Sequence, residues 1–290
     1  MTKITKAIIP VAGLGTRFFP ATKAISKEML PIVDKPCIQY LVEEAVASGI
    51  TEIIFVISKN QTAIKNHFST PLSLSKILKE RNKKTELALL QKIDKLAKIS
   101  YIYQKKPLGD GHAILCAKKL IKNEPVAILF GDDIWDYKTP PLLQLIKKFN
   151  KFSSPIIALE KIPKELTHKY GIIAKKDKNS KHFHQIKDFI EKPSPKKAPS
   201  NLAITGKYII TPKLLEHLSQ ARSNTKDEEL RLIDGMKSFI KENPIYGCEI
   251  EGIRFDTGDK LEYLKAVTHF TLKNKMLSPS FKKYLKGLAL

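Results

Sequence analysis

Short apolar runs alternate with amphipathic stretches through the first half of this chain. Strands are predicted where a brief, fully apolar or β-branched run is bounded by turn residues, at 7–11, 53–57, 100–103 and 126–130. Helices are predicted where apolar residues recur at helical intervals, at 38–47, 62–68 and 113–121, with one or two exposed helices over 72–97. Such alternation indicates right-handed crossovers, and therefore an α/β fold with a mainly parallel sheet and helices on both faces.

The second half of the chain has a mixed pattern. Strands are predicted at 156–159, 172–174, 183–190, 202–210 and near 246–250, and helices at 142–149, 214–221, 229–240 and 261–275. The one linker-like segment, 193–199, is short, so residues 1–275 are expected to form a single domain. The tail 276–290 resembles a loosely attached helix, which suits packing or an oligomer contact.

Charge and composition narrow the class of protein. The chain has 290 residues and a formal charge of +22, so anionic partners are expected and nucleic acid has to be considered. The basic residues are spread along the chain without interleaved aromatic residues, which favours a lysine-rich solvated surface over a nucleic-acid footprint. Three distant cysteines fit neither a disulfide framework nor a zinc site, and no segment resembles a signal peptide or a membrane span, so a cytoplasmic protein is expected.

A glycine-rich loop follows the first predicted strand. Gly13 and Gly15 let backbone N–H groups approach a ligand closely, and the cations Arg17, Lys23 and Lys27 suit a polyphosphate. The loop is not a dinucleotide-binding fingerprint, because Phe18 stands where a third glycine is needed, and the chain contains no Walker A string. A phosphate-binding loop of another kind is therefore predicted.

Two aspartates are placed to bind a metal ion. Asp132 follows the fully apolar strand 126–130, and Asp256 ends a second strand-like stretch far downstream. A carboxylate at the end of a buried strand that faces a phosphate loop is best explained as a magnesium ligand. Asp132 and Asp256 together are expected to hold one or two Mg²⁺ ions. His112, at the start of a predicted helix, is expected to be structural rather than catalytic.

Several motifs occur in an order that matches one enzyme family. They are GLGTR (13–17), PATK (20–23), KEMLP (27–31), YGI (170–172), EKP (191–193) and SNLA (200–203). These motifs resemble the signature of the sugar-phosphate nucleotidylyltransferases, and IVDKP (32–36) with IQY (38–40) resembles the bacterial UTP–glucose-1-phosphate uridylyltransferases more narrowly. The resemblance covers nearly the whole chain. It implies a Rossmann-like three-layer nucleotidyltransferase fold with a mixed, mainly parallel central sheet.

The resemblance also implies a reaction and an assembly. The reaction converts UTP and glucose 1-phosphate to UDP-glucose and diphosphate with Mg²⁺, in a homodimer or homotetramer. The nucleotide would bind to about residues 1–135 and the sugar phosphate to about residues 136–275. The implied catalytic residues are Arg17, Lys27 and Lys192; the nucleotide-binding residues are Ala12, Gly13, Gly15, Thr16, Gln104 and Gly109; the sugar-phosphate-binding residues are Gly171, Glu191 and Lys192; and the metal ligands are Asp132 and Asp256.

Two further expectations concern the sugar side of the site. Alternation along a strand would place Glu191 and Lys192 on opposite faces unless the strand bends at Pro193. Five positions depart from the family pattern and are expected to lie outside the catalytic set: Ser26, Lys105, Asp110, Arg231 and Ile233.

A general base is not needed for the implied reaction, because the second pKa of a phosphate monoester, about 6, already makes it a dianionic nucleophile at neutral pH.

Three rival functions remain open from the sequence. A sister enzyme that uses dTTP differs in its substrate by one base methyl, which is worth only about 1 to 3 kcal/mol in a pocket. A basic nucleic-acid-binding protein is motivated by the charge of +22. A non-catalytic sugar-nucleotide sensor is disfavoured, because both lysines and both aspartates of the implied site are present.

Overall fold

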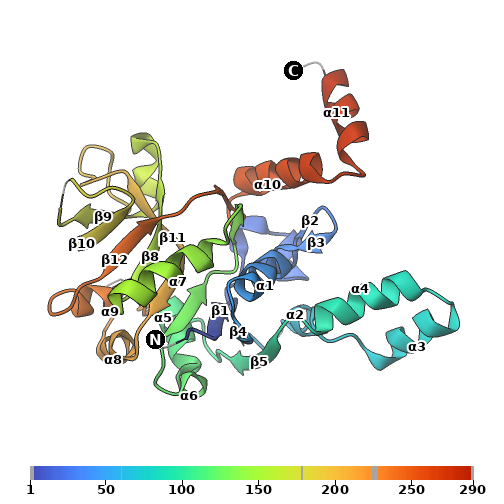
Figure 1. Ribbon diagram of the computed structural model, residues 1–290, viewed down its shortest axis with the longest axis horizontal. Helices are drawn as coiled ribbons and strands as arrows, with labels where there is room; N and C mark the ends of the chain where they lie inside the picture. The colour runs from blue at the N-terminus through green and yellow to red at the C-terminus, as the bar shows by residue number, and fades with distance from the viewer. Residues whose placement is uncertain (1–2, 60, 178, 224–227, 289–290) are drawn as a thin grey trace.

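The alternating pattern folds into one large mixed sheet with helices on both faces (Figure 1). The computed structural model describes residues 3–59, 61–177, 179–223 and 228–288. In these residues nine strands form the sheet in the order β5-β4-β1-β6-β11-β8-β12-β10-β9. Their bounds are β1 Lys6–Pro10, β4 Glu52–Ile57, β5 Lys98–Tyr103, β6 Val126–Leu129, β8 Ile156–Lys161, β9 Gly171–Lys175, β10 Phe183–Glu191, β11 Leu202–Ile210 and β12 Tyr246–Glu249.

The sheet is parallel at one side and largely antiparallel at the other. β5, β4, β1 and β6 pair in parallel, with Ile8 of β1 opposite both Ile54 and Ile128. β11 joins β6 and β8 antiparallel, and β10 pairs antiparallel with β12 and β9, while β12 runs parallel to β8. The predicted mixed sheet is confirmed, and its parallel part is the first half of the chain, where strands and helices alternate.

Helices cover both faces of the sheet and complete three layers. α1 (Cys37–Ala47) and α7 (Pro141–Phe152) pack on one face, where Ile9 belongs to their core. α5 (Asp110–Cys116), α6 (Lys118–Ile121), α8 (Pro212–Gln220) and α9 (Leu232–Phe239) pack on the other face, where Ile8 belongs to the core. Neighbouring residues of β1 thus serve opposite cores, as alternation along a strand requires. The predicted three-layer α/β fold is confirmed.

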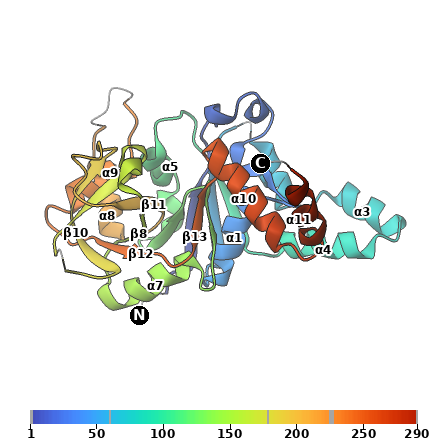
Figure 2. The same cartoon turned by 90° about the horizontal axis from the view of Figure 1, so that it is seen from above.

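The exposed helical stretch between β4 and β5 is divided in two. After α2 (Thr62–His67), the chain forms α3 (Leu72–Glu80) and α4 (Lys84–Asp94), which are separated by a turn in which Asn82 has a φ of +54°. The two helices extend away from the sheet (Figure 2). Neither contributes a residue to the cavities described below.

Two small ribbons, mostly missed by the sequence patterns, complete the structure. β2 (Pro31–Ile32) pairs with β3 (Lys35–Pro36), and β7 (Asp133–Asp136) pairs antiparallel with β13 (Ile253–Asp256). In the second ribbon Asp256 lies opposite Asp133, so a residue near the end of the chain is brought beside the end of β6. β7 and the first ribbon are too short for their periodicity to be visible in the sequence.

Helix α10 (Lys260–Lys273) packs across this ribbon, and α11 (Ser278–Gly287) extends beyond it (Figure 1). Asp136 accepts hydrogen bonds from His269 Nε2 at 2.7 Å and Lys273 Nζ at 2.5 Å. Partial burial opposes ionisation, but these hydrogen bonds outweigh it and lower the pKa of Asp136. Among the residues described, no helix is long and apolar enough to cross a membrane.

The anchoring of α10 by Asp136 is testable. We expect Asp136→Asn to lower the free energy of unfolding by about 1 kcal/mol at pH 7, because a charged acceptor shared by two donors is lost. A lowered pKa stabilises the folded state above the unfolded-state value of about 4, and this contribution disappears as the pH falls through the folded-state value. Urea unfolding at pH 7 and pH 3 should therefore show a larger difference at pH 7 than at pH 3.

Glu80 offers a matched control. Its carboxylate lies 3.9 Å from Lys76 Nζ on an exposed helix face, so Glu80→Gln should change the unfolding free energy by less than about 0.5 kcal/mol. An equal loss in the two variants would show that Asp136 contributes no more than an ordinary surface charge.

Candidate active site

Two cavities meet at the carboxyl ends of β1 and β6. The first has a volume of about 490 Å³ and the second about 350 Å³, and both are lined by Asp110, Phe130 and Asp132. The first contains Ala12, Gly13, Gly15, Thr16, Lys27, Gln104 and Gly109; the second contains Arg17, Gly171, Glu191, Lys192 and Asp256. Every site residue that the family resemblance implied therefore lies in one of two adjoining cavities, whereas Lys23 of the glycine loop lines neither.

The glycine loop begins where β1 leaves the sheet. The chain turns at Gly15, which has a φ of +64°, a conformation that favours glycine, and Thr22 Oγ1 donates a hydrogen bond to the Gly15 carbonyl at 2.7 Å. A Cβ atom added at Gly13 would meet no protein atom within 4 Å. Packing therefore does not require glycine at position 13, whereas close approach of a ligand to the backbone would.

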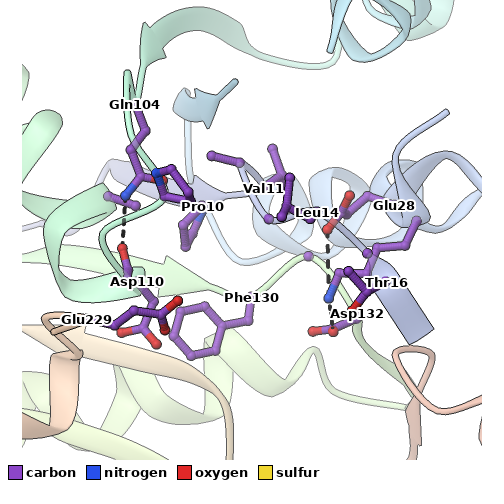
Figure 3. A pocket seen from close by; sticks show the side chains of 18 residues that line it. Pro10, Val11, Leu14, Thr16, Glu28, Gln104, Asp110, Phe130, Asp132 and Glu229 are labelled. Atoms are coloured by element: carbon purple, nitrogen blue, oxygen red, sulfur yellow. Dashed lines mark hydrogen bonds and ion pairs between the residues drawn. The ribbon is translucent and has the colours of Figure 1, made fainter. Parts of the chain in front are cut away.

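Charged side chains gather at one end of the first cavity (Figure 3). Lys27 Nζ hydrogen-bonds to Asp132 Oδ2 and lies 3.9 Å from Glu28 Oε1, while Arg17 Nη2 lies 4.0 Å from the same Asp132 oxygen. Burial opposes the charge on both partners of the Lys27–Asp132 pair, but their attraction outweighs it, so the pKa of Lys27 is raised and that of Asp132 is lowered. Both groups are held in their ionised forms.

Glu28 belongs to this cluster, although sequence reasoning assigned it no role. Its side chain is buried, and burial raises its pKa to about 7 despite the attraction of Lys27. Within the described part of the chain, its Oε2 atom is buried without a hydrogen-bond partner. Glu28 could have been proposed from the sequence, because it is the second residue of the KEMLP motif.

Asp132 and Asp256 face the same space beside Gly258. A Cβ atom added at Gly258 would lie 2.5 Å from Asp132 Oδ2 and 3.1 Å from Asp256 Oδ1. The absence of a Cβ thus lets two carboxylate oxygens approach the backbone here, together with Arg17 Nη2 at 2.8 Å from the same point. Carboxylate oxygens are ligands that a hard divalent cation prefers. No cluster of three acidic, His or Cys side chains suited to a metal occurs among the residues described, so phosphate oxygens and water would complete a coordination shell here.

Glu191 and Lys192 both line the second cavity, so the exception allowed for in the sequence analysis applies, and strand alternation does not continue through Lys192. β10 ends at Glu191, and Lys192 has a φ of +44°, which turns its side chain out of the strand alternation. Lys192 Nζ lies 3.8 Å from Glu191 Oε1. The bend that allows this arrangement is thus present, at Lys192, one residue before Pro193.

Three of the positions that depart from the family pattern line the second cavity: Asp110, Arg231 and Ile233. They therefore belong to the lining of the site, although none of them is a member of the implied catalytic set. Leu230 exchanges backbone hydrogen bonds with Leu108 and Gly111, which places the start of α9 over the start of α5. This contact between distant segments is invisible in the sequence. Asp110 accepts a hydrogen bond from the Leu232 N–H at 2.7 Å, and burial raises its pKa to about 6.

A buried network of charges lies directly behind the two aspartates. Arg254 contacts Asp133 at 2.5 Å, Glu160 at 3.2 Å and Asp256 at 3.9 Å. Lys207, which is fully buried, lies 3.1 Å from Asp133 Oδ2 and 3.3 Å from Glu44 Oε2. Each buried charge is paired, as its desolvation requires. The network holds the turn at Asp132 and the end of β13 in place, and sequence reasoning missed it because its members are far apart in the chain.

Comparison with known proteins identifies the family. Residues 6–273 match the family described as "Nucleotidyl transferase". The chain is 43% identical to a UTP–glucose-1-phosphate uridylyltransferase of Bacillus subtilis over 99% of this chain and 98% of that protein. Two solved structures are also similar to it.

A UTP-bound UGPase from Acinetobacter baumannii superposes with a TM-score of 0.88 at 34% identity, covering 99% of this chain and 100% of that one. A UDP-glucose pyrophosphorylase complexed with UDP-glucose superposes with a TM-score of 0.84 at 36% identity, covering 94% of this chain and 100% of that one. Sequence, fold and the paired cavities agree, and the chain belongs to the nucleotidyl transferase family, within its UTP–glucose-1-phosphate uridylyltransferase branch.

Proposed function

We propose that this chain catalyses transfer of the uridylyl group of UTP to glucose 1-phosphate, which yields UDP-glucose and diphosphate. The observation that carries this proposal is the meeting of two cavities at Asp132, with a cation on each side, Lys27 in the first and Lys192 in the second. The relatives named above, one of which is solved with UTP and another with UDP-glucose, support the same substrates.

The first cavity suits the nucleotide. Gln104 lies at one end of it and Asp132 at the other (Figure 3), so the base would lie at Gln104 and Gly109 and the triphosphate at the cluster of cations. The backbone of residues 12–16 would supply N–H donors to the phosphates, and Arg17 and Lys27 would offset their charge. Residues 1–135 would thus carry most of the nucleotide site.

The second cavity suits the sugar phosphate. Glu191 would accept hydrogen bonds from glucose hydroxyls, Lys192 would hold the phosphate, and Gly171 would allow close approach of the hexose. A phosphate oxygen of glucose 1-phosphate attacks the α-phosphorus of UTP, and the bond from that phosphorus to the bridging oxygen of the leaving diphosphate breaks. Because the nucleophile is already an anion, the residues need only hold two repelling anions together and stabilise the leaving diphosphate.

Mg²⁺ is the divalent cation that we assign to this site, and Asp132 and Asp256 would hold it. When bound, it would supply positive charge that offsets the charge developing on the phosphates. Lys27 hydrogen-bonds to Asp132 in this structure, so the lysine and the two carboxylates stand close enough to act on the same phosphates.

Asp256→Asn tests this assignment. We expect the Mg²⁺ concentration for half-maximal turnover to rise about tenfold, since one charged ligand is replaced by a neutral one. Binding of Mn²⁺ to the enzyme with UTP, measured by electron paramagnetic resonance, should weaken similarly. Asp259→Asn is the matched control, because Asp259 caps α10 in the same turn and lies in neither cavity. Unchanged metal dependence in Asp256→Asn would remove this residue from the metal site.

The proposed reaction is tested by measuring diphosphate release from each nucleoside triphosphate in the presence of glucose 1-phosphate, with and without Mg²⁺. We expect release with UTP, dependent on both glucose 1-phosphate and metal. Faster turnover with dTTP would favour the thymidylyltransferase alternative. Failure with every nucleotide, together with salt-sensitive binding of nucleic acid, would contradict the proposal. Assembly into a homodimer or homotetramer stays a prediction, which sedimentation equilibrium tests.

A further inference from the structure

The amide group of Gln104 is held at two points. Its nitrogen Nε2 lies 2.9 Å from the carbonyl oxygen of Gly109 and 3.0 Å from Nδ1 of His112. A carbonyl oxygen can only accept hydrogen bonds, so the atom that faces it must be the amide nitrogen. The contact with Gly109 therefore establishes which way the amide points.

The same contact establishes the state of His112. Because Nε2 of Gln104 carries two hydrogens and no accepting lone pair, Nδ1 of His112 must be the acceptor. The imidazole is then neutral and carries its proton on Nε2. His112 stands near the start of α5, where its backbone N–H contacts the carbonyl of Leu230 at 3.3 Å.

One atom of the amide remains for a ligand. With both hydrogens engaged, the side chain of Gln104 can offer only its oxygen Oε1, which hydrogen-bonds to no other described residue. Gln104 is 7% exposed, and it lines the nucleotide cavity. The base end of the cavity thus presents an acceptor and no donor from this side chain.

We propose that His112 is a positioning residue for base selection: it holds Gln104 so that Oε1 faces the nucleobase and accepts a hydrogen bond from a ring N–H. Uracil and thymine have such a group at N3, whereas N3 of cytosine is itself an acceptor and would face Oε1 without a proton between them. The inference rests on the proposed function, in which Gln104 reads the base, and it predicts rejection of CTP but not of dTTP. A polar group left unpaired in the site is the source of such discrimination.

His112→Phe tests the role by removing the acceptor while keeping a ring. Discrimination between UTP and CTP, measured as the ratio of their kcat/KM values, should fall about tenfold, because the amide loses one of the two contacts that orient it. The ratio of UTP to dTTP should stay unchanged, because both bases offer the same N–H. His112→Asn should restore discrimination, since the side-chain oxygen of asparagine can accept a hydrogen bond from Gln104.

Cys116→Ala is the matched control. Sγ of Cys116 lies 3.8 Å from His112 Nδ1, one helical turn away. Loss of this atom should leave the UTP-to-CTP and UTP-to-dTTP ratios unchanged. A purely structural histidine would lower kcat/KM for UTP and CTP equally, and an unchanged ratio in a folded His112→Phe would overturn the proposal. Absence of turnover with UTP in the wild-type enzyme would instead contradict the proposed function.

A second measurement does not require His112→Phe to fold. Nitrogen-15 spectra of the wild-type imidazoles, with His112 assigned by its loss in His112→Asn, should show a proton on Nε2 and none on Nδ1. A proton on Nδ1 of His112 in the enzyme with UTP bound would overturn the proposal.

Discussion

Lys27→Ala is expected to lower kcat for uridylyl transfer by at least about a hundredfold, the effect of losing one preorganised contact to developing charge. Lys27 is the cation placed most directly at the phosphate end of the first cavity, where its ammonium contacts Asp132 and approaches Glu28. Its raised pKa keeps it charged at any pH that the enzyme would meet. Steady-state rates of diphosphate release with saturating UTP and glucose 1-phosphate measure the loss.

Lys23→Ala provides the control for this variant. Lys23 lies in the same loop, is exposed and lines neither cavity, so its loss should change kcat by less than about twofold. The thermal unfolding midpoint should be measured for both variants, because Lys27→Ala also leaves Asp132 and Glu28 without their common partner. Near-normal turnover in a folded Lys27→Ala would remove this lysine from the chemistry.

Lys192→Ala is expected to lower kcat/KM for glucose 1-phosphate by about a hundredfold while leaving the KM for UTP nearly unchanged. Lys192 lines only the second cavity, and its backbone, with a φ of +44°, turns the side chain toward that cavity. Its partner Glu191 is 3.8 Å away, which leaves the ammonium able to contact an incoming phosphate. Initial rates at varied glucose 1-phosphate separate the two constants.

Lys196→Ala is the matched control, since Lys196 is an exposed lysine of the following turn and lines neither cavity. It should behave as the wild type does. If Lys192→Ala instead raised the KM for UTP and left kcat/KM for glucose 1-phosphate unchanged, the assignment of the second cavity to the sugar phosphate would be wrong.

The two lysines explain why the site is assembled from distant parts of the chain. UTP and glucose 1-phosphate are both polyanions, and Coulomb repulsion between two unit charges at 4 Å is about 1 kcal/mol in water but rises steeply where water is excluded. In the proposed mechanism, cations on both sides of Asp132 would offset this repulsion before the reaction begins. The acidic residues between them keep these cations oriented when the substrates are absent.

The sequence was most informative about elements that are formed by short, continuous segments of the chain. The parallel strands and the helices between them were predicted from periodicity, because each of these elements shows its buried face within about 5 to 15 residues. The glycine loop was recognisable because backbone conformation and ligand approach at Gly13 and Gly15 depend on the residues themselves. Asp132 could be proposed as a metal ligand because a carboxylate that directly follows a buried strand is placed at the edge of the sheet where ligands bind.

Only the tertiary structure decided how these parts meet. Asp256 reaches Asp132 because β13 pairs with β7, a strand too short to be seen in the sequence, and Arg254 and Lys207 hold that region through buried ion pairs with residues far from them in the chain. The shared cavity of Glu191 and Lys192 depends on one backbone angle at Lys192. Periodicity reports which face of an element is buried, whereas pairing of distant strands and a single φ angle are set by the packing of the whole molecule.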